Sequence, residues 1–162
     1  MPERDIYIAI GSNIEPARHI PAAVAELARF YAPLARSPAY RSRALGFDGP
    51  DFVNCVVRGR SNASAATVVA RLKELERAHG RREDDAIGSR ALDLDLILYG
   101  TEVIAGPTLT VPRPDILEYA FVLRPLAELA PHLAHPQTGR DFAWHWRHFV
   151  GAGLPLAPES LD

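Results

Sequence analysis

The segment from Leu92 to Leu98 constrains the fold more than any other part of this chain. It reads Leu-Asp-Leu-Asp-Leu-Ile-Leu, with a leucine at every second position, which is the period of a β-strand with one buried face. We therefore predict a strand over 91–99, with the leucines at 92, 94, 96 and 98 facing the core. Asp93 and Asp95 then share the opposite face, with Cα atoms about 7 Å apart.

Two carboxylates placed this way repel each other unless a cation lies between them. Magnesium is a good candidate, because it takes one or two protein carboxylates and keeps water and substrate phosphates as its other ligands. The alternative is a solvent-exposed strand face whose acids, Asp93 and Asp95, bind nothing. The period of the strand does not decide between the two interpretations.

Strands and helices alternate along the rest of the chain. We predict further strands over 5–11, 34–40 and 52–58, helices over 16–31 and 64–79, short extended pieces at 102–104 and 108–111, and a helix-like run over 117–129 with an interruption near Pro125. The segments 41–51 and 81–89 are expected loops, and the last thirty residues have no clear period. Such alternation indicates a layered domain of helices and strands, and the short late connections favour a mixed, mainly antiparallel sheet. No repeat or linker divides the chain, so we expect one domain over 1–162.

Composition excludes several classes of protein. The net charge of −2 argues against nucleic acid as a partner, since its binders usually carry a basic face. No run of about 18 apolar residues is present, so we expect no membrane span. The first residues lack the pattern of a secretory signal, and the single cysteine, Cys55, cannot form an internal disulfide. We therefore expect a cytoplasmic protein.

Arginines cluster before the acidic strand. Arg81 and Arg82 open the 81–89 loop and Arg90 closes it, three residues before Asp93. Cations together with a metal would suit phosphoryl transfer, where positioning and charge stabilisation do most of the work. Only one of the 18 basic residues, Lys73, is a lysine, so phosphate contacts would fall mainly to arginine. The alternative is that these arginines form salt bridges with the acidic residues of the loop. The sequence has no glycine-rich phosphate-binding loop, so a nucleotide would need another kind of site.

A flat ring could be recognised on the 52–58 strand. Asn54 lies on the face opposite Val53 and Cys55, and its amide offers a donor and an acceptor to a heterocycle edge. Phe52 and Phe121 could stack on such a ring. The alternatives are an edge asparagine that faces water and aromatic side chains that belong to the core.

The remaining candidates for chemistry are weak. Cys55 falls on the core side of its strand, so we expect an inert thiol. The histidines lack the acidic or cysteine partners of a zinc site. We expect surface helix positions for His132, His135, His145 and His148.

Several short motifs follow one another in a fixed order. They are Ile8-Ala9-Ile10-Gly11-Ser12-Asn13, Tyr40-Arg41-Ser42 through Leu45-Gly46, Asp51-Phe52-Val53-Asn54, Gly80-Arg81, Arg90-Ala91-Leu92-Asp93-Leu94-Asp95-Leu96, Leu109-Thr110-Val111-Pro112 and Phe121-Val122-Leu123-Arg124-Pro125-Leu126. In this order they resemble the 6-hydroxymethyl-7,8-dihydropterin pyrophosphokinases of folate biosynthesis, over roughly residues 5–131. The resemblance implies a ferredoxin-like α+β fold and attack of the pterin hydroxyl on the β-phosphorus of ATP, with release of AMP. It also implies Mg²⁺, expected as two ions, and small-molecule substrates bound by a monomer.

The resemblance also implies a role for individual residues. It assigns the metal to Asp93 and Asp95, and the chemistry to Arg81 and Arg90. The implied pterin contacts are Ser42, Arg43, Ala44, Leu45, Phe52, Asn54 and Phe121. The implied ATP contacts are Glu76, Arg82, Leu96, Thr110, Arg113 and Tyr119.

The chain departs from the family on the nucleotide side. The loop up to Arg90 is one residue shorter, and Glu83 stands about where a second loop arginine is expected. Arg113 replaces a histidine and Tyr119 replaces an arginine. We therefore expect slow turnover with normal pterin binding, and a Tyr119→Arg substitution that raises turnover. The alternatives are a paralogue acting on a related pterin, and a pterin-binding module with weakened catalysis.

Overall fold

The computed structural model describes residues 2–80 and 90–161. The predicted site residues Arg81 and Arg82, together with Glu83, lie outside the described residues. The elements run in the order β1 (Arg4–Ser12), α1 (Pro16–Tyr31), β2 (Ala35–Arg36), β3 (Ala39–Ser42), β4 (Phe52–Ser61), α2 (Ala65–Ala78), β5 (Asp93–Tyr99), β6 (Ile104–Ala105), β7 (Thr110–Val111), α3 (Asp115–Glu118), α4 (Ala120–Leu129), α5 (Phe142–Arg147) and β8 (Ala157–Glu159).

The central sheet has the order β5-β1-β4-β3-β8, with β2 also paired to β4. Every pairing between its described strands is antiparallel. The two units β1-α1-β3 and β4-α2-β5 each cross over one intervening strand, which is the split β-α-β arrangement of ferredoxin-like folds. The α+β fold class with a mainly antiparallel sheet is therefore confirmed.

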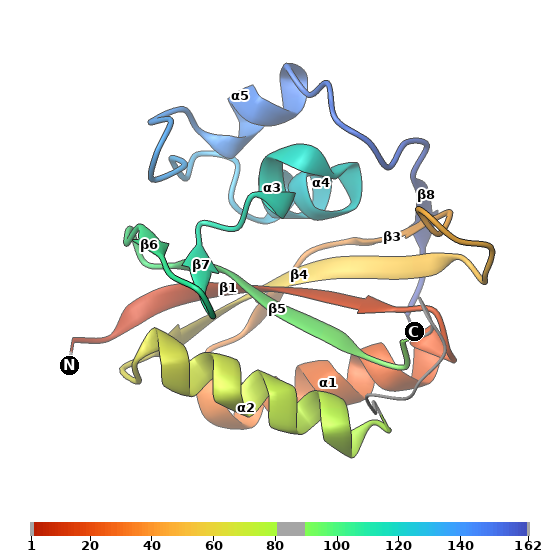
Figure 1. Cartoon of the computed structure of the whole chain (residues 1–162), viewed down its shortest axis with the longest axis horizontal. Helices are drawn as coiled ribbons and strands as arrows, with labels where there is room; N and C mark the ends of the chain where they lie inside the picture. The colour runs from red at the N-terminus through yellow and green to blue at the C-terminus, as the bar shows by residue number, and fades with distance from the viewer. Residues whose placement is uncertain (1, 81–89, 162) are drawn as a thin grey trace.

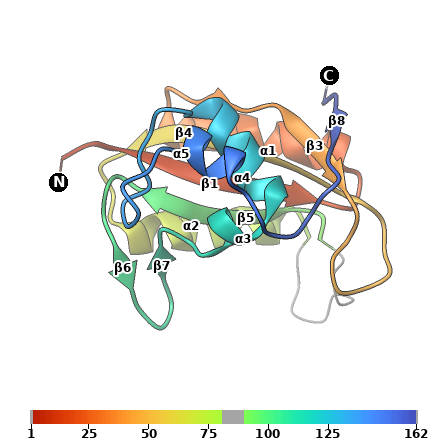
Figure 2. The same ribbon diagram turned by 90° about the horizontal axis from the view of Figure 1, so that it is seen from above.

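Helices cover both faces of the sheet (Figure 1). The helices α1 and α2 lie on one face, and α3 and α4 lie on the other with α5 outside them, as the view from above also shows (Figure 2). Ile6, Ile8 and Ile10 of β1 pack in the cluster under α1 and α2, whereas Tyr7 packs in the cluster under α4. Within the described residues, the helices are all too short or too polar to cross a membrane.

A β-bulge in β5 changes which face its residues occupy. Ile8 pairs with Leu96 and Tyr7 pairs with Leu98, so Ile97 is an extra residue on β5. Leu98 and Ile97 consequently both pack in the α4 cluster, while Leu94 and Leu96 pack in the α1/α2 cluster. The prediction that all the leucines of this strand share one face is wrong for Leu98.

The predicted strand over 34–40 is interrupted. It divides into β2 and β3, and β3 extends to Ser42. Ser37 lies between them, where its N–H donates to the Val56 carbonyl at 2.9 Å and its hydroxyl accepts from the Val56 N–H at 2.9 Å. Pro38 follows and has no N–H to continue a ladder, which explains the division.

The helix predicted over 117–129 breaks at Tyr119 and not near Pro125. Tyr119 has extended backbone angles, φ −125° and ψ 127°, and separates α3 from α4. Pro125 lies inside α4. The break follows from a neighbouring segment, because Tyr119 forms a parallel β-bridge with Ala152 near the end of the chain.

The last thirty residues, which had no clear period, contain α5 and β8. Asp141 caps α5 by accepting the Trp144 N–H at 2.8 Å. His135 is buried and lies outside any helix, with its Nδ1 accepting the N–H of Gln137 at 3.1 Å. The prediction of a surface helix position is therefore wrong for His135, and also for His132, which is exposed but lies in a turn between α4 and α5. Burial raises the pKa of the Cys55 thiol to about 12, in agreement with the expected inert cysteine.

Candidate active site

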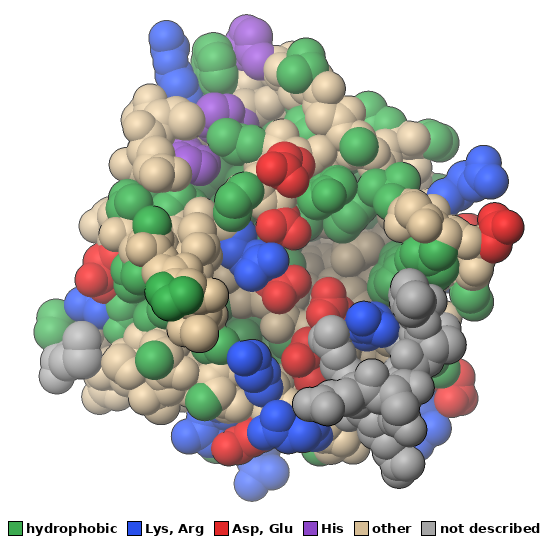
Figure 3. All heavy atoms as spheres, in the orientation of Figure 1, with side chains coloured by type: hydrophobic (Ala, Val, Ile, Leu, Met, Phe, Trp, Pro, Cys, Tyr) green, Lys and Arg blue, Asp and Glu red, His purple; other side chains and the backbone are tan. Residues whose placement is uncertain are grey.

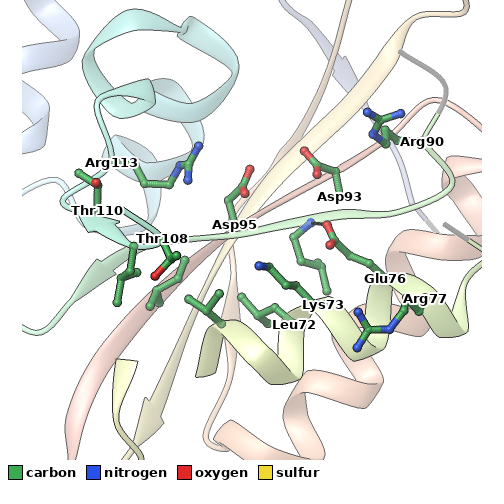
Figure 4. Close-up of a pocket in the computed structure, with 14 residues that line it drawn as sticks. Leu72, Lys73, Glu76, Arg77, Arg90, Asp93, Asp95, Thr108, Thr110 and Arg113 are labelled. Atoms are coloured by element: carbon green, nitrogen blue, oxygen red, sulfur yellow. Dashed lines mark hydrogen bonds between the residues drawn. The ribbon is translucent and has the colours of Figure 1, made fainter. Parts of the chain in front are cut away.

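A cavity of about 760 Å³ runs along the open edge of β5, the end strand of the sheet. It brings together predicted metal, catalytic and nucleotide residues from four parts of the chain (Figure 4). Its lining consists of Val69, Leu72, Lys73, Glu76, Arg77, Arg90, Asp93, Leu94, Asp95, Leu96, Thr108, Leu109, Thr110 and Arg113.

The two aspartates meet cations on the same side of β5. Asp93 and Asp95 are half-buried and project toward the side that also holds Arg90 and Arg113 (Figure 4). In the space-filling view, acidic and basic side chains gather around a hollow in the middle of this face (Figure 3). The cavity therefore presents carboxylates and guanidinium groups together, as binding of a metal with phosphates requires.

Asn13 holds Arg90 in place. The Arg90 N–H donates to the Asn13 Oδ1 at 2.7 Å, and the Asn13 N–H donates to the Arg90 carbonyl at 3.0 Å. Asn13 is only 4% exposed. We did not predict a site role for Asn13, and its position directly after β1 in a Gly-Ser-Asn turn was the available signal.

Glu76 fixes the edge of β5 from below. Its Oε2 accepts the Leu94 N–H at 2.8 Å, and the side chain is buried. The Leu94 N–H thus points away from β1, toward the open edge of β5. Successive residues of an antiparallel strand direct their backbone groups to alternate sides, so the N–H and C=O of Leu96 also face this open edge. Glu76 and Leu96, both predicted ATP contacts, thus lie in the cavity wall. Glu76 also accepts a backbone hydrogen bond from β5.

Arg113 is positioned by the bulge in β5. Its N–H donates to the Ile97 carbonyl at 3.1 Å, and its guanidinium Nη2 lies 3.4 Å from the Asp115 carboxylate. Its Nε is buried and has no hydrogen-bond partner within the described residues. Thr110 lines the same cavity. The structure therefore brings Arg113 and Thr110 to the cavity that holds Asp95.

Three polar residues that line the cavity were not predicted from the sequence. Lys73 and Arg77 reach the cavity from α2, and Thr108 reaches it from the segment before β7. The signal for the first two was helical spacing, because Lys73 lies three residues before Glu76 and four residues before Arg77, and residues three and four apart share a helix face. Thr108 carried no signal.

The predicted ring contact Asn54 lies in the same row of register partners across the sheet as Asp93. Gly11 of β1 pairs with Asp93 on one side and with Asn54 on the other, and Asn54 pairs in turn with Tyr40. A Cβ on Gly11 would lie 2.7 Å from the Asn54 Nδ2. The absence of a side chain at Gly11 thus makes room for the Asn54 amide.

Two polar atoms in this region are buried and lack hydrogen-bond partners in the described part of the chain. They are the Asn54 Oδ1 and the Ser42 Oγ. Phe52, the register partner of Ser42, is half-buried and has its ring centroid 6.3 Å from that of Phe47. Buried polar atoms without partners are costly, so this pair indicates a place where a ligand supplies them.

The remaining predicted contacts divide into two groups. Arg43, Ala44 and Leu45 follow β3 directly, and Leu45 is exposed. Phe121 is half-buried and stacks on Tyr119, with ring centroids 5.1 Å apart and planes at 15°. Tyr119 does not line the cavity that holds Arg113. The structure therefore groups Tyr119 with the predicted ring wall.

The donor set fits Mg²⁺. Within the described residues, no group of three or more His, Cys, Asp or Glu side chains could hold a metal by itself. The pair Asp93 and Asp95 supplies hard oxygen ligands beside a cavity large enough for phosphates. Magnesium commonly takes its other ligands from water and substrate phosphate, so these two residues would hold it.

The open edge of the sheet holds two aspartates and two arginines around one large cavity, which suits an enzyme that transfers phosphoryl groups. Residues 7–131 match the family model described as 7,8-dihydro-6-hydroxymethylpterin-pyrophosphokinase (HPPK). That match covers most of the chain, and the chain belongs to this family.

Relatives with this activity in their names are similar over most of the chain. One is the 2-amino-4-hydroxy-6-hydroxymethyldihydropteridine pyrophosphokinase of Pseudomonas aeruginosa, 40% identical over 135 residues, covering 81% of this chain and 83% of that protein. The protein of the same name from Synechocystis sp. is 38% identical over 136 residues, covering 82% of this chain and 70% of that one. The folic acid synthesis protein fol1 of Pneumocystis carinii is 31% identical over 157 residues, which are 94% of this chain and 21% of that longer protein.

Proposed function

We propose that this chain transfers pyrophosphate from ATP to 6-hydroxymethyl-7,8-dihydropterin, giving the pterin diphosphate and AMP in folate biosynthesis. The observation that carries the proposal is the register of three strands, which sets Asn54 and Asp93 on either side of Gly11. Two strand spacings separate them, about 10 Å. A pterin ring bound at Asn54 would therefore place its hydroxymethyl group over Gly11, close to the carboxylates of Asp93 and Asp95.

The pterin would be held by polar and aromatic groups. Asn54 and Ser42 offer the buried atoms that lack partners in the described residues, and the ring edge would satisfy them. Phe121 and Phe52 would stack on its faces. This arrangement orients the hydroxymethyl group toward Asp93, which is the positioning that an in-line transfer needs.

The nucleotide would lie along the edge of β5. Leu96 presents backbone groups to a base edge, and Thr110 and Glu76 lie beside it in the cavity. Arg90 and Arg113 would contact the phosphates, and the predicted contacts Arg81 and Arg82 would add to them. The pterin oxygen forms a bond to the β-phosphorus, the bond from that phosphorus to the α–β bridging oxygen breaks, and the hydroxyl proton is released.

Magnesium, when bound, neutralises phosphate charge and helps to align the transferring group. We propose that Asp93 and Asp95 would hold the metal, as two ions. We also propose a single-domain monomer that works in the cytoplasm. Cys55 is a free, buried cysteine, as is common for proteins of a reducing compartment.

The test is a product assay with ATP and Mg²⁺, with and without 6-hydroxymethyl-7,8-dihydropterin. We expect AMP and pterin diphosphate in equal amounts, formed only when the pterin is present. Formation of ADP, or AMP release that does not depend on the pterin, would contradict the proposal. Chromatography of both nucleotide and pterin products distinguishes these outcomes.

A pterin-binding module with weakened catalysis is the second candidate. The observation that favours it is Tyr119, which takes the place of a family arginine and stacks on Phe121 outside the cavity. A single-turnover measurement separates the candidates. Tight pterin binding with no product, or with product formed much more slowly than the pterin dissociates, would support the module, and product formation faster than pterin dissociation would exclude it.

A further inference from the structure

The chain beyond residue 131 lies outside the family match, yet part of it contacts the ring-binding residues. We call residues 151–159 the C-terminal strap. It follows the segment after α5 and runs past the start of α4 to β8 beside β3 (Figures 1 and 2). Both ends of the strap therefore lie next to elements that carry predicted pterin contacts.

The first end of the strap holds the start of α4. The Ala152 N–H donates to the Glu118 carbonyl at 2.8 Å, and the Ala120 N–H donates to the Ala152 carbonyl at 2.8 Å. These two bonds bracket Tyr119, whose ring stacks on Phe121. The backbone that carries the aromatic wall is thus fixed by the strap.

Gly153 touches the wall itself. Its φ is +99°, and a Cβ there would lie 3.0 Å from the Phe121 Cδ2 and 3.3 Å from the Ala120 nitrogen. A side chain at this position would therefore both strain the backbone and push on the Phe121 ring. Glycine allows the strap to lie directly against the ring.

The second end of the strap holds β3. Ala157 pairs with Arg41, and Glu159 accepts two hydrogen bonds from the Arg41 guanidinium, both at 2.9 Å. Such a two-bond pair fixes geometry as well as charge. Ser42, whose Oγ is buried without a partner in the described residues, follows Arg41 directly.

We propose that the strap sets the distance between Phe121 and β3, with Gly153 and Glu159 as positioning residues for the bicyclic ring. The proposal rests on the proposed function, because it assumes that Phe121 and Ser42 contact the pterin. It adds a determinant of ring selectivity in a part of the chain that the family match does not cover.

Gly153→Ala tests the first end, with Gly139→Ala as the matched control. Gly139 also has a positive φ, +73°, but a Cβ there would meet nothing within 4 Å. Both variants therefore strain the backbone, and only Gly153→Ala presses on Phe121. We expect Gly153→Ala to weaken binding of 6-hydroxymethylpterin at least about tenfold and raise the pterin KM, with the ATP KM unchanged. Gly139→Ala should leave both unchanged.

A charge swap tests the second end and does not depend on the folding of Gly153→Ala. Arg41→Glu and Glu159→Arg should each weaken pterin binding, and the double variant should restore most of it while the ATP affinity stays constant. Equal pterin affinities for Gly153→Ala and Gly139→Ala, or a swap without rescue, would overturn the inference and leave the function intact. A wild-type protein that fails to bind 6-hydroxymethylpterin would overturn the function and the inference together.

Discussion

Asn54 and Asp93 are register partners of the same residue, Gly11, from the two strands that flank β1. One residue without a side chain thus lies between the predicted ring contact and the predicted metal ligand. A substrate that reaches from one to the other must cross the bare backbone of β1. Added volume at Gly11 would therefore obstruct both Asn54 and the path to Asp93.

Gly11→Ala should weaken pterin binding through Asn54. The new Cβ would lie 2.7 Å from the Asn54 Nδ2, so the amide must move. We expect pterin affinity to fall by about tenfold or more, since an unpaired polar group costs about 1–3 kcal/mol. Asn54→Ala should cause a similar loss, and calorimetry with pterin and with ATP measures both.

The double variant provides the control for this prediction. If Gly11 acts only by leaving room for Asn54, then Gly11→Ala should cost almost nothing in the Asn54→Ala background. Additive losses would show that Gly11 contributes separately. Asn54→Ala should not destabilise the fold, because the Asn54 Oδ1 has no hydrogen bond in the described residues to lose.

Asp95→Asn should remove transfer while preserving the fold. The substitution keeps the shape of the side chain and removes the charge that a divalent ion requires. We expect turnover to fall by about 10²–10³ or more, as for other charge-stabilising groups, with a far-UV spectrum like that of the wild type. The matched control is Asp5→Asn at the other end of β1, where Asp5 pairs with Arg60. Near-normal turnover of Asp95→Asn at limiting Mg²⁺ would show that the metal assignment is wrong.

Arg113→Ala should lower kcat more than it changes pterin affinity. Arg113 lines the same cavity as Asp95. Its backbone N–H bonds to the Ile97 carbonyl and its guanidinium pairs with Asp115. Loss of one phosphate contact should reduce kcat by about 10². Arg29→Ala, on the exposed side of α1, is the control and should leave kcat unchanged. An unchanged kcat in Arg113→Ala would place the phosphates elsewhere.

Tyr119→Arg separates two views of this position. The family pattern predicts that an arginine here raises turnover, whereas the structure stacks Tyr119 on Phe121. Loss of an aromatic pair costs about 0.5–1.5 kcal/mol, so we expect pterin affinity to fall by roughly two- to tenfold. A rise in kcat with unchanged pterin affinity would show that the side chain reaches the phosphates.

The fold should lose stability in mild acid. Burial lowers the pKa of His19, and the neighbouring His79 lowers it further. The Nδ1 atoms of the two histidines lie 2.7 Å apart. A histidine whose folded pKa lies below its unfolded value of about 6.5 binds more protons when unfolded. Its stabilisation is therefore present above pH about 6.5 and is lost as the pH falls below that value.

Urea denaturation at pH 7.5 and 5.5 measures this effect. We expect the midpoint to fall toward pH 5.5, and to fall less in His19→Gln. Some loss should remain in the variant, because burial also lowers the pKa of His135 and His145. Identical pH dependence in wild type and His19→Gln would exclude His19 as a source.

Short-range patterns predicted the layers of this fold well, because each depends on residues within one element. The leucine period of β5 and the apolar spacing of α1 needed no information from elsewhere. Two of the failures depend on contacts distant in sequence. The bulge at Ile97 depends on pairing with β1, and the break at Tyr119 depends on Ala152.

The sequence alone could name candidate residues for the site but could not give their arrangement. Asp93 and Asp95 follow from one strand, but the row through Gly11 and Asn54 requires the register of three strands. Asn13 was missed because its role is a pair of bonds to Arg90, 77 positions further along the chain. The strand β8 could not be predicted, since three residues with a central proline form a strand only when an open edge such as β3 accepts them.

The extra residue in β5 divides one strand into two with different freedom to change. Before Ile97, one face of the strand carries Asp93 and Asp95, which are half-buried, and after it Leu98 and Tyr99 are both buried. Removal of Ile97 would restore an unbroken ladder with β1 and preserve the pairing of Leu98 with Tyr7, while the carbonyl that holds Arg113 would be lost. Ile97 is itself fully buried under α4, so the backbone position of Arg113 and the packing of that layer depend on the same residue.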